Sequence, residues 1–480
     1  MADSASIAPH PPGFRNRRTL NWLLAGTMYA FFYMARYNFA AANARLSEIF
    51  GWSNAQIGII DSATSLVYGA AVFLNGPLAD RIGGRRAILI GAAGTALFNL
   101  LFGFGHLFLG APAVWAGEGA ARHVVTPAEV QLGMTGTTVL AFFAVVWAFN
   151  FYFQSYGALS IVKINAAWFH LRERGFFSGI FGILIRAGLV LAFTGCPFLM
   201  HHLPWQWVFW IPAACVAVLF VLNLLFVRNT PGEAGYPDLD TGDGSAAEPA
   251  GPVTLSDVLK KVVASSTMWT IALASMMIGF VRRSVVDSWW PKYFVNVHHA
   301  DAKALSDFVP YEIAAWGIAI AGIAGGLVFG YLSDNLFHGR RAPVVVIGFL
   351  GMAVLLVAFG VLGAAGAGPF AAAFSLVALS FFVNGAHGMV GGAASMDFGG
   401  KKAAATAAGL FDGMQYIAGA FVGYGVGRLI DRAGWGAWPF APVPFALAGA
   451  ALMSRLWNAV PGRSHHGAAA TPADADAKAA

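Results

Sequence analysis

Two arginines stand inside stretches that are otherwise apolar enough to cross a membrane. Arg36 lies in the first such stretch, MYAFFYMARYNFAAAN, and Arg282 lies about half the chain later in IGFVRRSVVDSWWPKYF. A guanidinium group near the bilayer centre costs roughly 2.5–3.5 kcal/mol on insertion scales, so each arginine should face a polar interior. Guanidinium groups also match phosphate oxygens as planar, bidentate donors. The pattern predicts two related halves that each contribute one arginine to a central anion-binding cavity.

The residues around these arginines add detail. Tyr29, Tyr33 and Arg36 are spaced i, i+4 and i+7, so one helix face carries two hydroxyl groups and a guanidinium. Arg283 projects about 100° away from Arg282, so we expect it to contact a neighbouring helix rather than a substrate. Ordinary packing explains tyrosines at helical spacing equally well, so their role stays open at this point.

Ionisable residues in other apolar segments offer alternatives. Asp287 follows Arg282 by five residues and Asp61 lies in the second segment, so either acid could pair with an arginine and leave no anion site. Intramembrane charges are functional candidates by default. The candidate coupling or charge-pair residues are Asp61, Arg186, His387 and Asp412. For Arg186 we favour a structural pair with Asp61 or Asp412, and for His387 a hydrogen-bonded place in a glycine-rich helix.

The composition places the chain in a membrane. Of its 480 residues, 58% are hydrophobic and 11% charged, against about 25% charged in soluble proteins. A helix crosses the bilayer with about 20 largely apolar residues, and such segments begin near 19, 54, 87, 136, 176, 205, 265, 309, 343, 370, 403 and 437. We therefore expect an all-α membrane protein with twelve transmembrane helices in two pseudo-symmetric six-helix bundles. The expected boundaries are a disordered cytoplasmic tail at 1–18, an N-terminal bundle at 19–227, a cytoplasmic linker at 228–262, a C-terminal bundle at 263–460 and a disordered cytoplasmic tail at 461–480.

The distribution of charge predicts the orientation. The net charge is +6, but the basic residues are scattered over short loops instead of forming one patch, which argues against nucleic acid as a partner. Most lysines and arginines fall in the loops that lie on one side if the N-terminus is cytoplasmic, so we expect both termini in the cytoplasm of a bacterial-type inner membrane. Cys196 and Cys215 lie in apolar segments and are expected to be small buried hydrophobes rather than a disulfide.

Related loops follow the second and the eighth apolar segments. The first is GPLADRIGGRR and the second is GYLSDNLFHGRR, again about half the chain apart. Each has a small residue, an acid and a basic turn, and such internal duplication is typical of transporters built from paired halves. The residues expected to gate the cytoplasmic side are Gly76, Asp80, Arg81, Arg85, Asp334 and Arg340.

The first loop resembles the signature of the major facilitator superfamily. MYAFFYMARYNFA, RRSVVDSWWPKYF and KKAAATAAGLFDGMQYIAGAFVGYGVGRLIDRAGW are similar to the organophosphate:phosphate antiporters of that superfamily, which carry glycerol phosphate or hexose phosphate. The resemblance implies that Arg36 and Arg282 bind phosphate. It further implies cavity-lining roles for Tyr29, Tyr33, Tyr68 and Tyr416.

Several positions depart from the family pattern. The resemblance places Val72, Ala158, Ile185 and Gly279 where the family commonly has lysine, tryptophan, histidine and tyrosine. The phosphate clamp is therefore kept while the rest of the cavity is rebuilt, so the substrate beyond its phosphate need not be a usual one. The loop at 110–135 is longer than is usual in the family.

The expected function is exchange of an organic phosphate, such as a sugar phosphate or glycerol phosphate, for inorganic phosphate by rocker-switch alternating access. Two alternatives remain open: a proton-coupled symporter of another organic anion, such as a carboxylate or phosphonate, and a transporter-like sensor of sugar phosphate. The sequence has no nucleotide-binding glycine loop, no metal-ligand spacing and no nucleophile–base pair, so we expect no enzyme activity, no cofactor and no metal site. The expected partners are a small anion and membrane lipid, and the expected state is a monomer.

Overall fold

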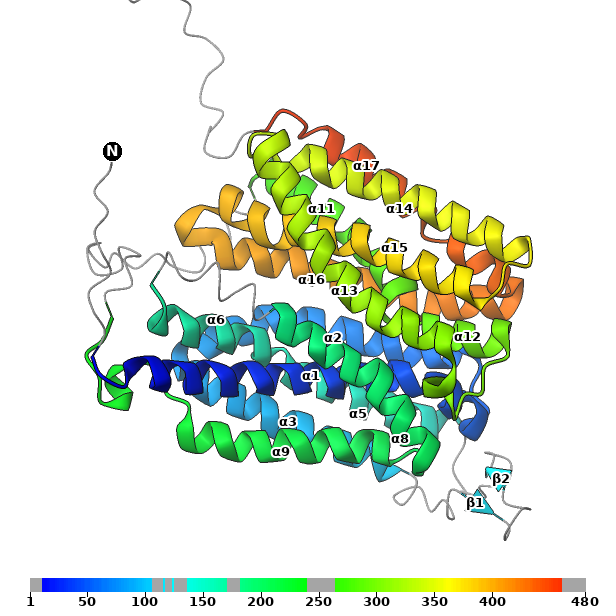
Figure 1. Ribbon diagram of the computed structural model, residues 1–480, viewed down its shortest axis with the longest axis horizontal. Coiled ribbons are helices and arrows are strands. Elements are labelled where there is room, and N and C mark those ends of the chain that lie inside the picture. Colours follow the sequence, from blue (N-terminus) through cyan, green and yellow to red (C-terminus); the bar gives the residue numbers. More distant parts are fainter. Residues whose placement is uncertain are drawn as a thin grey trace, which may run out of the picture.

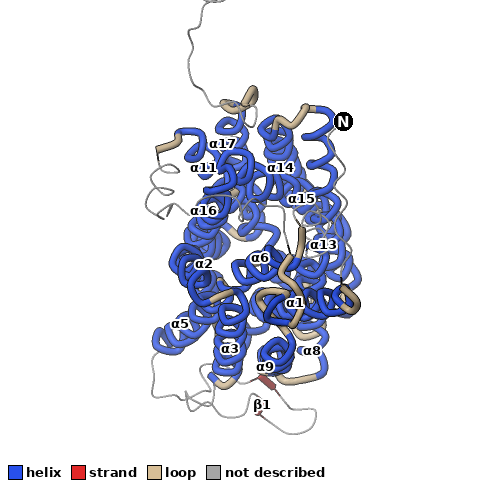
Figure 2. The backbone as a smooth tube through the Cα atoms, turned by 90° about the vertical axis from the view of Figure 1, so that its left-hand side faces the viewer, coloured by secondary structure: helices blue, strands red, loops and turns tan. Residues whose placement is uncertain are grey.

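The computed structural model describes residues 11–105, 115–116, 123–124, 136–170, 182–239 and 264–459, and its helices lie in two layers. One layer holds the helices up to α9 and the other holds those from α11 onward (Figure 1). Seen from the direction of Figure 2, many helices are viewed close to end-on, as expected for a bundle that crosses a membrane.

Within the described residues, the N-terminal bundle contains six spans, some of them interrupted. Its elements are α1 (Phe14–Phe50), α2 (Asn54–Ile82), α3 (Gly84–Gly103), α5 (Gly136–Gln154), α6 (Tyr156–Trp168), helical residues 182–190, η2 (Leu191–Gly195), α8 (Cys196–His202) and α9 (Trp207–Phe226). Between α3 and α5, β1 (Trp115–Ala116) pairs antiparallel with β2 (His123–Val124). The rest of the long loop at 110–135 lies outside the described residues.

In the part of the chain that the structure describes, the C-terminal bundle contains the other six spans. Its elements are α11 (Ser266–Val281), η4 (Arg282–Asp287), α12 (Trp290–His298), η5 (Leu305–Asp307), α13 (Val309–Tyr331), η6 (Leu332–Leu336), α14 (Arg341–Ala364), α15 (Pro369–His387), η7 (Gly388–Ala394), α16 (Ser395–Ala433), η8 (Trp435–Phe440) and α17 (Val443–Ser454). Together with the N-terminal six, these spans agree with the expected twelve-helix architecture.

Ten spans within the described residues are long and apolar enough to cross a membrane. The other two, α1 and α16, are the longest helices at 37 and 39 residues but are more polar. Their polar side chains include Arg36 on α1 and Asp412 and Gln415 on α16. Because a polar helix is stable in a membrane only when its polar groups face protein or water, these two helices are the natural walls of an internal site.

Glycines allow α2 and α16 to pack closely across the bundle interface. A Cβ atom added at Gly58 would lie 2.2 Å from the carbonyl oxygen of Gly423, and one added at Gly427 would lie 2.2 Å from the carbonyl oxygen of Asn54. Small residues permit such backbone approach, which is a main source of helix association in membranes. The two bundles are therefore held together along this pair of helices.

Polar contacts close one end of the bundle interface. We call it the α1–α2 end, because it contains the connection between Phe50 and Asn54. There the Lys292 ammonium donates to Ser47 Oγ at 2.6 Å, and the Asn43 amide donates to the carbonyl of Ser288 at 3.1 Å. Among the described residues, the hydrogen bonds between the bundles lie from this end to the middle of the molecule.

The helix that carries Arg282 is not a regular α-helix. Residues Arg282–Asp287 form a π-helical turn, η4, between α11 and α12. The indole of Trp438 donates to the carbonyl of Ser284 at 2.9 Å, so a backbone acceptor within this turn is satisfied by a side chain from the neighbouring span. Such turns inside helices often mark functional sites. Here the turn holds two arginines and an aspartate.

The predicted domain boundaries need two adjustments. Helix α1 begins at Phe14, so residues 14–18, which were expected in the disordered N-terminal tail, are helical. The start of the expected linker, 228–239, packs on the N-terminal bundle, where the rings of Tyr236 and Phe14 are 5.5 Å apart. Aromatic burial at these positions explains why both segments are ordered. The remainder of the linker and the expected C-terminal tail at 461–480 lie outside the described residues.

Candidate anion-binding site

Arg36 is buried in the middle of α1 and is surrounded by neutral groups. Its side chain is 3% exposed, and its Nε donates to Gln154 Oε1 at 2.7 Å. Its two terminal nitrogens make longer contacts, Nη1 to the Tyr416 hydroxyl at 3.2 Å and Nη2 to the Tyr68 hydroxyl at 3.5 Å. N–H···O bonds are typically 2.9–3.0 Å long. The guanidinium is thus anchored by Nε, while its two terminal groups are weakly held and suited to accept an anion.

Aromatic rings enclose the same guanidinium. The Arg36 Cζ atom lies 4.7 Å from the centre of the Tyr68 ring and 4.9 Å from that of Tyr33. Ring faces attract cations, most strongly where water is excluded. Tyr29 lies one turn earlier, and its ring contacts that of Tyr33 at 5.3 Å. The structure therefore brings Tyr33, Tyr68 and Tyr416 to Arg36, whereas Tyr29 supports this group from behind Tyr33.

Arg282 reaches the same region from the C-terminal bundle. Its Nε lies 3.2 Å from Asp287 Oδ2, so the acid pair that the sequence left open is present. Its Nη1 points to Gln415 Oε1 at 3.5 Å, a long contact that leaves this part of the fork weakly held. The side chain is 17% exposed. One edge of the guanidinium is thus held by the carboxylate, and the other faces α16.

The two arginines meet at adjacent residues of α16. Arg36 contacts Tyr416 and Arg282 contacts Gln415. Opposite bundles therefore direct their guanidinium groups to one turn of one helix. Among the described residues, Arg36 has no carboxylate within ion-pair distance, so its charge is left for a ligand to neutralise.

Surface exposure along α16 shows that this turn borders an open chamber. Asp412 is exposed, and Tyr416, one turn later on the same face, is half-buried. Phe421 is 64% exposed and faces lipid. Positions nine residues apart on an α-helix project about 180° apart, so Asp412 points away from lipid and its exposed surface borders space inside the protein. A carboxylate and a tyrosine of α16 thus line an internal chamber.

Arg186 reaches across the bundle interface from helical residues 182–190 to α15. Its Nη2 donates to Asn384 Oδ1 at 2.6 Å, and its guanidinium packs against Gly322 of α13. The structure joins Arg186 to neither Asp61 nor Asp412, so the expected charge pair is wrong. An amide from α15 is its partner instead.

His387 makes the hydrogen bond that was expected of it. Its Nδ1 lies 2.9 Å from Gln415 Nε2. Since an amide nitrogen can only donate, Nδ1 accepts and the ring proton resides on Nε2. Gln415 also donates to Ser275 Oγ at 3.0 Å. His387 and Ser275 thereby orient the amide so that its oxygen faces Arg282.

Arg283 and Asp61 form a polar cluster that adjoins the anion site. Arg283 Nη1 lies 3.7 Å from Asp287 Oδ2, and the Arg283 Cζ atom lies 4.9 Å from the centre of the Tyr416 ring. Arg283 Nη2 donates to Ser65 Oγ at 2.8 Å, and Arg283 as a residue is 5% exposed. Arg283 is also the cation that interacts most strongly with the Asp61 carboxylate. As its angular offset from Arg282 predicted, Arg283 contacts a neighbouring helix, α2.

The expected gating residues are placed at the opposite end of the bundles from the α1–α2 end. Asp334 pairs with Arg341 at 2.5 Å, not with Arg340, whose Nε donates to the carbonyl of Phe337. The backbone N–H of Arg85 donates to the Asn229 amide at 2.8 Å. Gly76 lies in α2 with no atom near its missing side chain, and Arg81 is exposed. The side chain of Asp80 lies outside the described residues.

Comparison with known proteins agrees with this architecture. The sequence profile of the Major Facilitator Superfamily matches residues 25–423, which include most of both bundles. The chain belongs to this superfamily. Its fold resembles that of the D-xylose–proton symporter, whose crystal structure matches with a TM-score of 0.68 over 93% of this chain and 98% of that one, at 14% identity.

Named relatives of this major facilitator transporter include carriers of phosphate esters. It is 28% identical to the glycerol-3-phosphate transporter of Bacillus subtilis over 442 residues, 90% of each chain. It is also 28% identical to a probable hexose phosphate transport protein of Chlamydia pneumoniae, covering 90% of this chain and 89% of that one. The membrane sensor protein UhpC of Escherichia coli is 25% identical, covering 85% of this chain and 84% of that one. The resemblance to organophosphate antiporters is thereby confirmed.

The structure explains one of the departures from the family pattern in this transporter, the glycine at position 279. A Cβ atom added at Gly279 would lie 2.6 Å from the Cα of Gln415. A tyrosine therefore cannot occupy this position while α11 and α16 pack as they do. Glycine brings α16 close enough for Gln415 to contact Arg282. No pattern in the sequence singled out Gln154, Gln415 or Asn384, because uncharged amides are less conspicuous than charged residues in a membrane-spanning segment.

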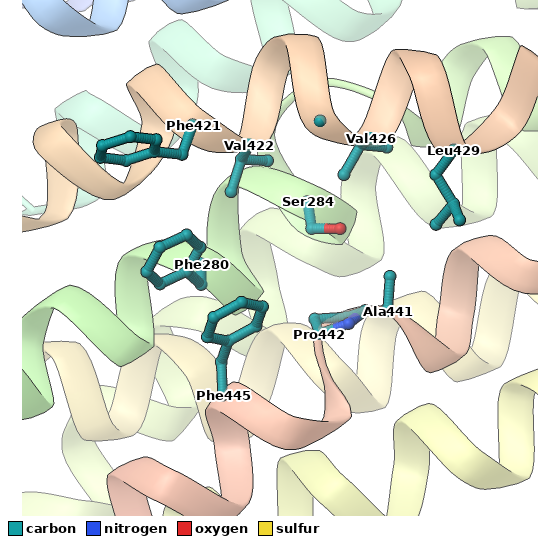
Figure 3. Close-up of a pocket in the computed structure, with 10 residues that line it drawn as sticks. Phe280, Ser284, Phe421, Val422, Val426, Leu429, Ala441, Pro442 and Phe445 are labelled. Carbon is teal, nitrogen blue, oxygen red and sulfur yellow. The ribbon is translucent and has the colours of Figure 1, made fainter.

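A lateral pocket of the transporter is unsuited to the anion. It has a volume of about 220 Å³ and lies between η4, α16 and α17, where Figure 3 shows Phe280, Val422 and Phe445 around it. Ser284 is its one hydroxyl-bearing lining residue, and no charged side chain lines it. A phosphate there would lose its hydration without a compensating cation. This pocket is therefore not a candidate for the anion site, and the region between Arg36 and Arg282 is.

Proposed function

We propose that this transporter exchanges an organic phosphate for inorganic phosphate by alternating access. The observation that carries the proposal is the convergence of Arg36 and Arg282, from opposite bundles, on the Tyr416–Gln415 turn of α16. Phosphate groups match arginine forks with two parallel, charge-assisted hydrogen bonds. The named relatives, a glycerol-3-phosphate transporter and probable hexose phosphate carriers, support the same substrate class.

The contacts of Arg282 suggest how the substrate is coupled to movement. An arriving phosphate competes with Asp287 for the Arg282 fork, which is bound through Nε and only weakly through Nη1. Binding also neutralises Arg36, whose charge has no acid beside it in the described part of the chain. A buried uncompensated charge is costly to enclose. The loaded transporter therefore changes conformation readily and the empty one does not, which produces obligatory exchange.

The charge distribution of the loops supports placing the α1–α2 end outside and both termini in the cytoplasm of a bacterial inner membrane. The described conformation is then closed on the outer side, where Lys292 contacts Ser47 and Asn43 contacts Ser288. In a rocker-switch cycle these contacts break as the inner side closes. The central arginines are exposed to each side in turn.

Counterflow in proteoliposomes tests the proposed exchange. Vesicles loaded with inorganic phosphate should take up labelled phosphate, glycerol 3-phosphate or a hexose phosphate, whereas empty vesicles should not. Mock vesicles without protein control for leakage. If loaded vesicles accumulate none of these compounds, the exchange proposal is refuted.

A sensor of sugar phosphates is the second candidate, favoured by the similarity to the membrane sensor protein UhpC. A sensor would bind a hexose phosphate at the same arginines but carry out little net exchange. Binding measured by thermal shift separates the two, because a ligand that binds only the folded protein stabilises it. Stabilisation by a hexose phosphate without counterflow supports a sensor, and stabilisation with counterflow supports the transporter.

A further inference from the structure

An unpaired carboxylate shares the chamber with the arginines. Asp412 is exposed to the chamber, and among the described residues it makes no hydrogen bond and no ion pair. Its strongest electrostatic partners are Arg282 and then Arg36. A site that served only a phosphate group would gain nothing from a negative charge facing this space, because like charges repel. The position of Asp412 therefore points to a second feature of the ligand.

The charges around the chamber do not balance for a simple phosphate ester. Arg282 is paired with Asp287, and Arg186 is held by the neutral amide of Asn384. Arg283 and Asp61 offset one another in the adjoining cluster.

Among the described residues, the charges that remain are those of Arg36, Arg186 and Asp412, a net charge of +1. A phosphate monoester carries close to −2 near neutral pH, so it would leave the closed chamber with a net −1. A ligand of net charge −1 would leave it neutral, which is the arrangement least costly to bury.

An ammonium group on the ligand satisfies both conditions. It changes the net charge of a phosphate monoester from −2 to −1, and it provides the cation that the Asp412 carboxylate lacks. A hydroxyl group on the ligand could donate a hydrogen bond to Asp412, but it would leave the net charge of the loaded chamber at −1. The chemistry of the chamber thus distinguishes between these two groups.

The separation of the groups fits a small molecule. Asp412 lies four residues before Tyr416, whose hydroxyl contacts Arg36, so the two positions are about 6 Å apart along the helix axis. That interval corresponds to a few covalent bonds between a phosphate and an amine. His387 lies near Asp412 across Gly391, where an added Cβ would be 3.7 Å from the imidazole and 3.9 Å from the carboxylate. Gly391 therefore leaves room beside the carboxylate.

We propose that the transporter selects organic phosphates that carry a primary ammonium group, with Arg36 and Arg282 binding the phosphate and Asp412 binding the ammonium. This inference rests on the proposed function of the two arginines as a phosphate clamp. Its substrate class is an amino sugar phosphate or an amino alcohol phosphate.

Matched ligand pairs test the selection. Proteoliposomes loaded with inorganic phosphate take up labelled phosphate at pH 7, and unlabelled compounds compete for entry. Glucosamine 6-phosphate should compete better than glucose 6-phosphate, and phosphoethanolamine better than ethylene glycol monophosphate. Loss of one charge-assisted contact predicts a difference of about 10-fold or more within each pair.

Two variants locate the effect at the carboxylate. Asp412→Asn should abolish the preference within both pairs while leaving phosphate itself a competitor, and Asp412→Glu, which keeps the charge, should retain the preference. Equal competition within the pairs by the unmodified transporter would overturn the inference, as would a preference that persists in Asp412→Asn. An uptake of glucose 6-phosphate that depends on external acid only while Asp412 is present would also overturn it, since the carboxylate would then carry a proton.

The outcome is separable from that of the proposed function. If labelled phosphate does not enter and Arg36→Ala does not alter phosphate binding, the phosphate clamp itself is wrong. If phosphate exchange proceeds without any preference for the amino compounds, the clamp stands and only the role of Asp412 is wrong.

Discussion

Replacing Arg36 by lysine tests the anion site at its most informative point. The substitution keeps the positive charge but removes the planar fork. In the native protein, Arg36 Nε donates to Gln154 at 2.7 Å. Its two terminal nitrogens contact the hydroxyls of Tyr416 and Tyr68 at 3.2 and 3.5 Å, and a phosphate can replace both of these contacts. A lysine ammonium acts as a single point donor without the fixed fork geometry. It therefore retains about one of the two phosphate contacts.

The magnitude follows from this count of contacts. A hydrogen bond to a charged group contributes about 1.5–3 kcal/mol. Losing one such bond should weaken phosphate binding roughly 10- to 100-fold, since 1.4 kcal/mol is a factor of ten. Arg36→Ala loses both contacts and the charge, so we expect a weakening of about 1,000-fold or more. Gln154 and the two tyrosines remain in place, and the fold should survive.

Isothermal titration of the purified transporter with inorganic phosphate gives the affinity directly. Arg283→Lys is the matched control, because it makes the same change in a buried arginine of the neighbouring cluster, where Ser65 is the hydrogen-bond partner. We expect that control to lower thermal stability more than phosphate affinity. If Arg36→Lys binds phosphate within threefold of the unmodified protein while remaining folded, the clamp geometry is refuted.

Three further predictions concern closure of the α1–α2 end, followed by the distance between spin labels at the exposed positions Glu48 and Arg432. Gly58→Leu should remove the label-to-label distance of the closed form, because its Cβ would lie 2.2 Å from a backbone oxygen of α16. An unchanged distance between the labels would contradict the packing argument. Asp431 accepts from the first N–H groups of α2 at 3.1 and 2.8 Å, so Asp431→Ala should disfavour closure by about 1 kcal/mol, roughly fivefold in population. Burial lowers the pKa of Lys292 to about 8; opening exposes the lysine and restores its pKa to about 10.4. The closed form thus binds fewer protons and should gain population as pH rises from 8 towards 10, and Lys292→Met should remove this pH dependence.

Much of the fold could be predicted because lipid makes polar groups conspicuous. Apolar length gave the spans, the repeated loops gave the duplication, and the family resemblance was confirmed over most of the chain. Arg36 and Arg282 could be singled out because a charge inside an apolar segment is costly wherever it points. The different direction in which Arg283 projects could be predicted as well, since helical geometry alone sets its angle to Arg282.

The partners of these residues could not be predicted in the same way. Arg186 was expected beside an acid, but it contacts Asn384 across the bundle interface. A charge pattern identifies acids and bases, whereas the choice between a carboxylate and an amide depends on which helix faces which. The amides of Gln154 and Gln415 contact the two central arginines. These contacts also depend on which helices face each other, so the sequence pattern does not predict them.

The sequence by itself determined that this is a duplicated helical membrane protein with one buried arginine per half, because the cost of placing charge in lipid is a property of each segment alone. Only the tertiary structure decided that both arginines meet one turn of α16, that Arg282 is already held by Asp287 while Arg36 has only neutral partners, and that Asp412 faces the chamber. These facts depend on helix rotation and on glycine contacts between bundles. Such contacts join residues that are hundreds of positions apart, and no local pattern encodes them.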